Sequence, residues 1–177
     1  MLTATYSIVA ISTEQKNARS VLFKLQQYIR SCLKKLQEVD VTTVESALNK
    51  LTQFDQYCHA RKVEMYVIPA VRGTTREVDS LLSELESISE RCIDILRSVQ
   101  RQLRQAFDQG LVKLNELCNA LEIYCDNLFK RLKKEEEELM PMVGRLLTVD
   151  EWFPIAAKFL SDDAENKKRP HLPLLPV

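Results

Sequence analysis

The residues best suited to chemistry are a run of acids at the end of a long apolar pattern. Glu135 opens a run of four glutamates that is followed by Leu139, Met140 and Pro141. Leucines and cysteines recur every three or four residues through residues 114–132, and this spacing places Glu135 on the same predicted buried face of a helix. A carboxylate on a buried face needs a partner, which could be a metal ion, a positive side chain or water.

One of the two histidines of the chain, His59, opens a similar segment. Residues 59–71 read HARKVEMYVIPAV, and residues 131–143 read RLKKEEEELMPMV. Each segment has a lysine, then a glutamate two positions later, then a proline five positions after that glutamate. Imidazole and carboxylate groups are ligands for iron, manganese or zinc, so a metal ion is one possible partner of Glu135.

The rest of the chain predicts an all-α fold that would position these segments. Apolar residues at helical spacing predict long helices over residues 13–37, 42–69, 75–106 and 111–141. Thr148 and Glu151 form a capping-box pattern before a short fifth helix over residues 152–160. Residues 1–12 show no helical period and are expected to be extended or irregular, while Pro69 and Gly110 are expected to end the second and third helices.

Four amphipathic helices with short connections favour an antiparallel up-down four-helix bundle with a short C-terminal fifth helix. We expect residues 1–161 to form this bundle and residues 162–177 to form a charged, proline-rich tail. The tail contains Pro170, Pro173 and Pro176 and could carry an interaction as an extended segment.

The composition argues against several classes of function. The 25 basic and 25 acidic residues balance, which does not favour a nucleic-acid partner. The chain lacks an apolar run of the roughly 20 residues that a membrane helix needs, and its start is a poor secretory signal, so we expect a cytoplasmic protein with no membrane partner. The five cysteines form no CxxC pair and are expected to be buried free thiols. No combination of nucleophile, base and acid stands out, so we expect no enzymatic activity.

The two matching helix ends, together with the bundle pattern, resemble the hemerythrin-like (HHE cation-binding) domain over about residues 8–161. The resemblance implies that the second and fourth helices each carry a His and, four residues later, a Glu that point into the bundle. It also implies one His on each of the first and third helices. Together these side chains would hold a pair of iron ions, and family members bind oxygen, respond to iron or nitric oxide, or bind other cations.

This chain departs from that ligand pattern at four of six positions. Counting back from Pro69 and Pro141, the family's His and Glu positions fall on His59 and Val63 in one helix and on Arg131 and Glu135 in the other. The two remaining His positions fall on Lys16 and Ser89, within about a residue. No metal is therefore expected; if one binds, His59 and Glu135 are its ligands.

The replacement of ligands by cations suggests what now fills the site. A guanidinium does not lose its proton in proteins, and a cation beside a metal pair is repulsive. We therefore expect Glu135 to pair with Arg131, which is four residues away on the same helix, or with Lys16. We expect His59 to bond to Asp55 or to Glu135.

Two functions follow from these expectations. The first is a non-enzymatic hemerythrin-like protein with an eroded di-iron site, acting as a binding, sensing or interaction module. The alternative is a functional cation- or di-iron-binding protein for oxygen binding, iron sensing or oxidative or nitrosative defence. It would use the unusual ligands His59, Glu135, Glu64, Asp55 and Glu136. An unknown protein partner or a homodimer is compatible with either function.

Overall fold

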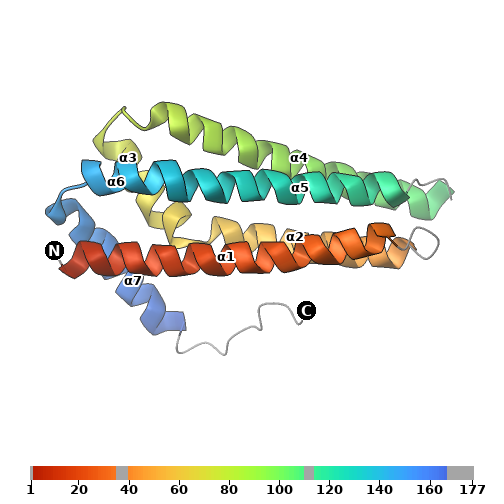
Figure 1. Ribbon diagram of the computed structural model, residues 1–177, viewed down its shortest axis with the longest axis horizontal. Helices are drawn as coiled ribbons and strands as arrows, with labels where there is room; N and C mark the ends of the chain where they lie inside the picture. The colour runs from red at the N-terminus through yellow and green to blue at the C-terminus, as the bar shows by residue number, and fades with distance from the viewer. Residues whose placement is uncertain (1, 35–39, 110–113, 167–177) are drawn as a thin grey trace.

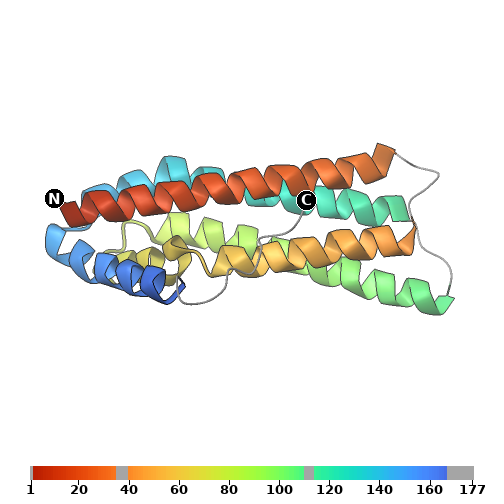
Figure 2. The ribbon, with the colours of Figure 1, turned by 90° about the horizontal axis from the view of Figure 1, so that it is seen from below.

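The computed structural model describes residues 2–34, 40–109 and 114–166. Four long helices lie side by side and alternate in direction along the chain (Figures 1 and 2). They are α1 (Leu2–Lys34), α2 (Val41–His59), α4 (Asp79–Gln109) and α5 (Leu114–Lys134). This arrangement confirms the predicted all-α, antiparallel four-helix bundle. Within the described residues, no helix is long and apolar enough to span a membrane.

The second and fourth long helices both continue into a π-helical turn and a short α-helix. α2 is followed by η1 (Val63–Val67) and α3 (Ile68–Thr74), and α5 by η2 (Glu135–Leu139) and α6 (Met140–Leu146). The prediction of one unbroken helix that stops at Pro69 is therefore wrong. Both prolines instead lie in the first turn of the short helices.

The π turns explain how the chain passes each proline without ending a helix. In an α-helix, a proline has no N–H to donate and its ring clashes with the carbonyl four residues earlier. Here the N–H of Ile68 donates to Val63 O and that of Met140 to Glu135 O, each across five residues. This wider turn is the local change that lets the helix resume at the proline.

The N-terminal residues are helical, so the prediction of an irregular segment over residues 1–12 is wrong. Ser7 and Ile11 are fully buried there. The first turns of α1 pack against α7 (Val149–Asn166), which lies across one end of the bundle (Figures 1 and 2). Packing against a distant segment thus stabilises a helix that the local sequence pattern does not reveal.

The fifth helix has the predicted capping box, but it begins at Val149, before the predicted Trp152, and ends later. The backbone N–H of Thr148 donates to the Glu151 carboxylate at 2.7 Å, and Glu151 N–H donates back to Thr148 Oγ1 at 3.4 Å, which is the predicted capping box. α7 continues to Asn166, so residues 162–166 are helical. Gly110 and the three prolines of residues 167–177 lie outside the described residues.

The apolar core forms two clusters that meet near the π turns. One fills the body of the bundle and includes Phe54, Leu121 and Leu128, and the other fills the end capped by α7 and includes Val63, Leu139 and Phe159. All five cysteines are buried free thiols, as predicted.

Candidate functional site

Glu135 lies where these two clusters meet and is fully buried. Its carboxylate accepts two hydrogen bonds from Arg61, with Nη1–Oε2 at 2.8 Å and Nη2–Oε1 at 2.9 Å. Arg131 Nε donates to Oε1 at 3.0 Å, and Gln15 Nε2 donates to Oε2 at 3.4 Å. The partner of the buried acid is therefore a pair of guanidinium groups with one amide.

Arg61 is the member of this network that sequence reasoning missed. Arg61 lies seven residues after the buried Phe54 and three after the buried Cys58, so helical spacing places it on the same buried face. α2 ends at His59, and the Arg61 side chain is 1% exposed in the core. This spacing is the sequence signal that could have identified Arg61 as a partner of the buried acid.

Arg131 is the predicted partner four residues before Glu135, and this ion pair is confirmed. Its second and third nitrogens reach other elements. Nη1 donates to the backbone carbonyl of Leu85 on α4 at 3.3 Å, and Nη2 bonds to the Glu64 carboxylate on η1. Arg131 thus links α5 to both neighbouring segments while it remains buried.

The network contains two positive and two negative side chains, Arg61, Arg131, Glu64 and Glu135. Burial acts to raise the pKa of Glu135, but the charges and hydrogen bonds of the two arginines outweigh it and hold that pKa below its usual value. Burial acts to lower the pKa of Arg61, and the Glu135 charge raises it overall. For the less enclosed Glu64, burial outweighs Arg131 and raises the pKa.

The remaining predicted positions do not all meet at Glu135. Lys16 is exposed on α1, so its predicted pairing with Glu135 is wrong, and the neighbouring Gln15 points inward instead. Val63 is fully buried among apolar side chains at the start of η1, and Ser89 is half-buried on α4.

His59 is half-exposed and lies beside Asp55. Of its two predicted partners, Asp55 and Glu135, the structure places it next to Asp55. Its Nε2 is 3.4 Å from Asp55 Oδ2. Asp55 also accepts a hydrogen bond of 2.9 Å from the buried Tyr124. Glu136, which the cation-binding alternative also used, is exposed and pairs with Arg19 on the outside of the bundle.

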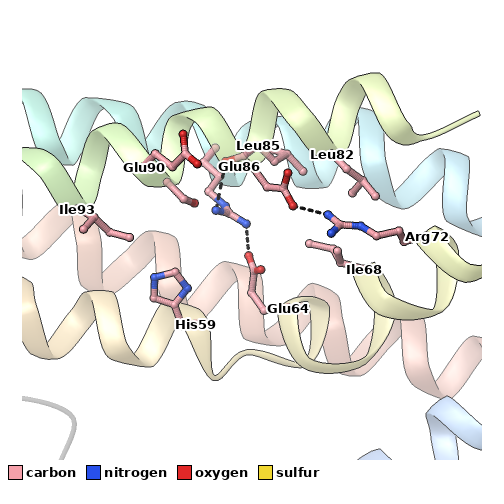
Figure 3. Close-up of a pocket in the computed structure, with 11 residues that line it drawn as sticks. His59, Glu64, Ile68, Arg72, Leu82, Leu85, Glu86, Glu90 and Ile93 are labelled. Carbon is pink, nitrogen blue, oxygen red and sulfur yellow. Dashed lines mark hydrogen bonds and ion pairs between the residues drawn. The ribbon is translucent and has the colours of Figure 1, made fainter. Parts of the chain in front are cut away.

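An open cleft of about 320 Å³ leads from the surface to Arg131. Figure 3 shows His59 and Glu64 on one side and Glu86 and Glu90 on the other, with Ile93 at one end and Ile68 near the other. Arg72 pairs with Glu86 across the cleft. Glu64 in turn pairs with Arg131 at the inner end of the cleft.

The residues present do not fit a pair of metal ions. Both oxygens of Glu135 accept hydrogen bonds from guanidinium groups, which have no lone pair with which to bind a metal. Across residues 2–34, 40–109 and 114–166, no group of three or more His, Cys, Asp or Glu side chains could hold a metal ion. The buried side-chain nitrogens and oxygens of this part of the chain all have hydrogen-bond partners.

The arrangement of the helices by itself indicates a class of protein. Antiparallel four-helix bundles commonly build metal or ligand sites from inward-facing side chains of opposed helices, which is where the network lies. The family model described as the hemerythrin HHE cation binding domain matches residues 8–143. The chain therefore belongs to the hemerythrin HHE family. Neither curated proteins nor solved structures gave a significant match.

Proposed function

We propose that this chain is a hemerythrin-family protein that works without a metal pair, as a non-enzymatic binding, sensing or interaction module. The observation that carries this proposal is the double engagement of Glu135 by Arg61 and Arg131. The acid that would be a metal ligand in the family pattern already pairs with two buried cations.

Electrostatics support the proposal. A metal ion at Glu135 would have to displace at least one guanidinium and would leave that cation buried beside a second positive charge. Breaking a buried ion pair by removing one partner typically costs about 3–5 kcal/mol, before the repulsion of the metal itself is counted. The network is therefore a strong competitor for the place of a metal.

The chemistry of the surrounding groups supports a non-enzymatic role. His59 pairs with Asp55, and Glu64 pairs with Arg131, so neither side chain is a free acid or base in this arrangement. The buried thiols are poor nucleophiles, because burial raises the pKa of Cys58 and of Cys92 to about 12. Free buried thiols also suit the cytoplasmic location that we propose.

Metal analysis tests the proposal directly. Protein expressed in iron-rich medium is expected to be colourless and to contain no stoichiometric iron by mass spectrometry. Since a ligand that binds the folded state raises its melting temperature, added Fe²⁺, Mn²⁺ or Zn²⁺ should leave that temperature unchanged. Stoichiometric iron with a near-ultraviolet charge-transfer band would overturn the proposal, and its loss in Glu135→Gln would locate the iron at this site.

A further inference from the structure

The outer face of α7 carries an apolar stripe. Val149, Phe153 and Leu160 are 53%, 64% and 57% exposed. At 100° per residue these three positions fall within about 40° of one another around the helix. The exposed Ala157 and Ala164 lie along the same line. We call this set of residues the α7 stripe.

The α7 stripe is not needed to hold α7 on the bundle, because an adjoining face of the helix does that. Trp152, Ile155, Ala156 and Phe159 are buried there, against α1 and η1. Phe159 stacks near Tyr66, and Asp163 pairs with Lys62. The helix therefore has two apolar faces, of which the bundle uses one. Contiguous exposed apolar residues of this kind commonly mark an interaction site.

The charges around the α7 stripe indicate what could cover it. α7 has one basic side chain, Lys158, which lies 5.5 Å from the ring centre of Tyr66. Two exposed acidic residues lie near its two ends, Asp150 and Glu165. Of the other acids of α7, Asp162 and Asp163 bond to Tyr66 and Lys62 of the bundle, and Glu151 belongs to the capping box. A second copy of α7 would bring acids against acids in either direction, and an anionic membrane surface would be repelled. Basic residues beside an apolar face would be complementary.

We propose that the α7 stripe binds a basic amphipathic helix of another protein. In such a complex leucine-like side chains would pack on Phe153 and Leu160, and lysines or arginines would lie beside Asp150 and Glu165. Proteins commonly recognise an amphipathic helix in this way, through contacts with apolar side chains that recur at helical spacing. The inference rests on the proposed function, because it names the partner class of the interaction module.

A designed peptide tests the surface in the full chain. The probe is a helical peptide of about 18 residues, the length of α7, with leucines on one face and lysines on both flanks. A control peptide replaces the lysines by glutamates. We expect the lysine peptide to shift amide NMR signals of residues 149–165 and to bind less tightly as salt is raised. Equal binding of the glutamate peptide, or signal changes elsewhere, would overturn the proposal.

Matched variants distinguish binding at the α7 stripe from nonspecific hydrophobic binding. Phe153→Ser and Leu160→Ser should each weaken binding of the lysine peptide about tenfold, as expected for loss of one buried apolar anchor. Phe23→Ser and Ile123→Ser, at positions 55% and 54% exposed on α1 and α5, should leave it unchanged. Asp150→Asn with Glu165→Gln should weaken it, whereas Glu45→Gln should not. Equal effects of the stripe and control variants would contradict the proposal.

Two further measurements show whether something other than a partner helix covers the α7 stripe. Dimerisation of the full chain that Phe153→Ser removes would assign the stripe to a second copy. Changes in stripe signals caused by Leu174→Ser, without peptide, would assign it to the chain's own C-terminal residues. Metal-free protein that does not bind the peptide would end this inference alone, whereas stoichiometric iron would end the proposed function and leave peptide binding to be judged separately.

Discussion

The carboxylate of Glu135 accepts hydrogen bonds from two guanidinium groups in a place fully shielded from water. Removing a charged group from water costs several kcal/mol, and only well-placed partners offset that cost. Arg61 supplies the strongest form of partner, a bidentate pair with two short, parallel hydrogen bonds. The folded state therefore depends on Glu135 being present and ionised.

Glu135→Gln tests that dependence. The amide keeps the size of the side chain and removes its charge, so Arg61 and Arg131 are left to share the Glu64 carboxylate. We expect the free energy of unfolding in urea at neutral pH to fall by about 3–5 kcal/mol. Glu137→Gln, in the same run of acids but exposed, is the control and should change it by less than about 0.5 kcal/mol. Equal losses in the two variants would show that the ion network contributes little.

A double variant distinguishes the charge imbalance from the loss of attraction. Arg61→Met with Glu135→Leu removes one cation and one anion and leaves Arg131 paired with Glu64. We expect the double variant to be more stable than the sum of the two single losses predicts, with a coupling of about 0.5–3 kcal/mol. Additive losses in urea unfolding would indicate that Arg61 and Glu135 do not act as a pair.

Part of this site could be predicted from the sequence. The four-residue spacing on one helix identified the Arg131–Glu135 pair, because such residues share a face whatever the rest of the fold does. Helical spacing from the buried Phe54 and Cys58 could also have placed Arg61 on the buried face, but its contact with Glu135 joins two different helices and depends on how they pack. Gln15 was missed by one position, because the register of α1 has no proline or glycine to fix it. Local spacing thus predicted the local contact, and tertiary geometry determined the others.

At the scale of the elements, the shared pattern of the two helix ends has a structural counterpart. Both segments contain a π turn followed by a proline in the first turn of a short α-helix. The sequence pattern therefore predicts that the two ends are alike, but it does not predict that the chain forms a π turn and continues past each proline. A π turn also starts at Glu135 itself, and such turns are frequent at functional sites.

The capping box of α7 gives an element-scale prediction. Thr148 and Glu151 exchange hydrogen bonds that satisfy N–H groups at the start of the helix. Thr148→Ala should lower the free energy of unfolding by about 1 kcal/mol, the usual cost of losing such a cap. Thr13→Ala, whose hydroxyl bonds to the Val9 carbonyl within α1, is the matched control and should have a smaller effect. Denaturant unfolding of both variants checks this, and an equal or larger loss in the control would contradict it.

At the scale of the whole molecule, the network connects segments from all four long helices. Gln15 comes from α1, Arg61 follows α2, Leu85 O belongs to α4, and Arg131 belongs to α5. The network thus links the four long helices through one buried carboxylate and the two guanidinium groups that bond to it.

The stability of the fold at low pH should depend on the protonation of Glu135. Because its pKa in the folded protein is lowered by Arg61 and Arg131, its stabilisation is complete above the ordinary glutamate pKa of about 4.3. That stabilisation is lost as pH falls through the lower folded value. Glu64 and Glu14 act in the opposite direction, because burial raises the pKa of each and the folded state takes up their protons first.

The comparison of wild type with Glu135→Gln isolates this contribution, because Glu64 and Glu14 are present in both proteins. The difference in unfolding free energy should be largest at neutral pH and should shrink as pH falls below about 4.3, where a protonated Glu135 resembles glutamine. Urea unfolding at a series of pH values measures it. A difference in unfolding free energy that stays constant until the protein unfolds would mean that the negative charge of Glu135 does not stabilise the fold.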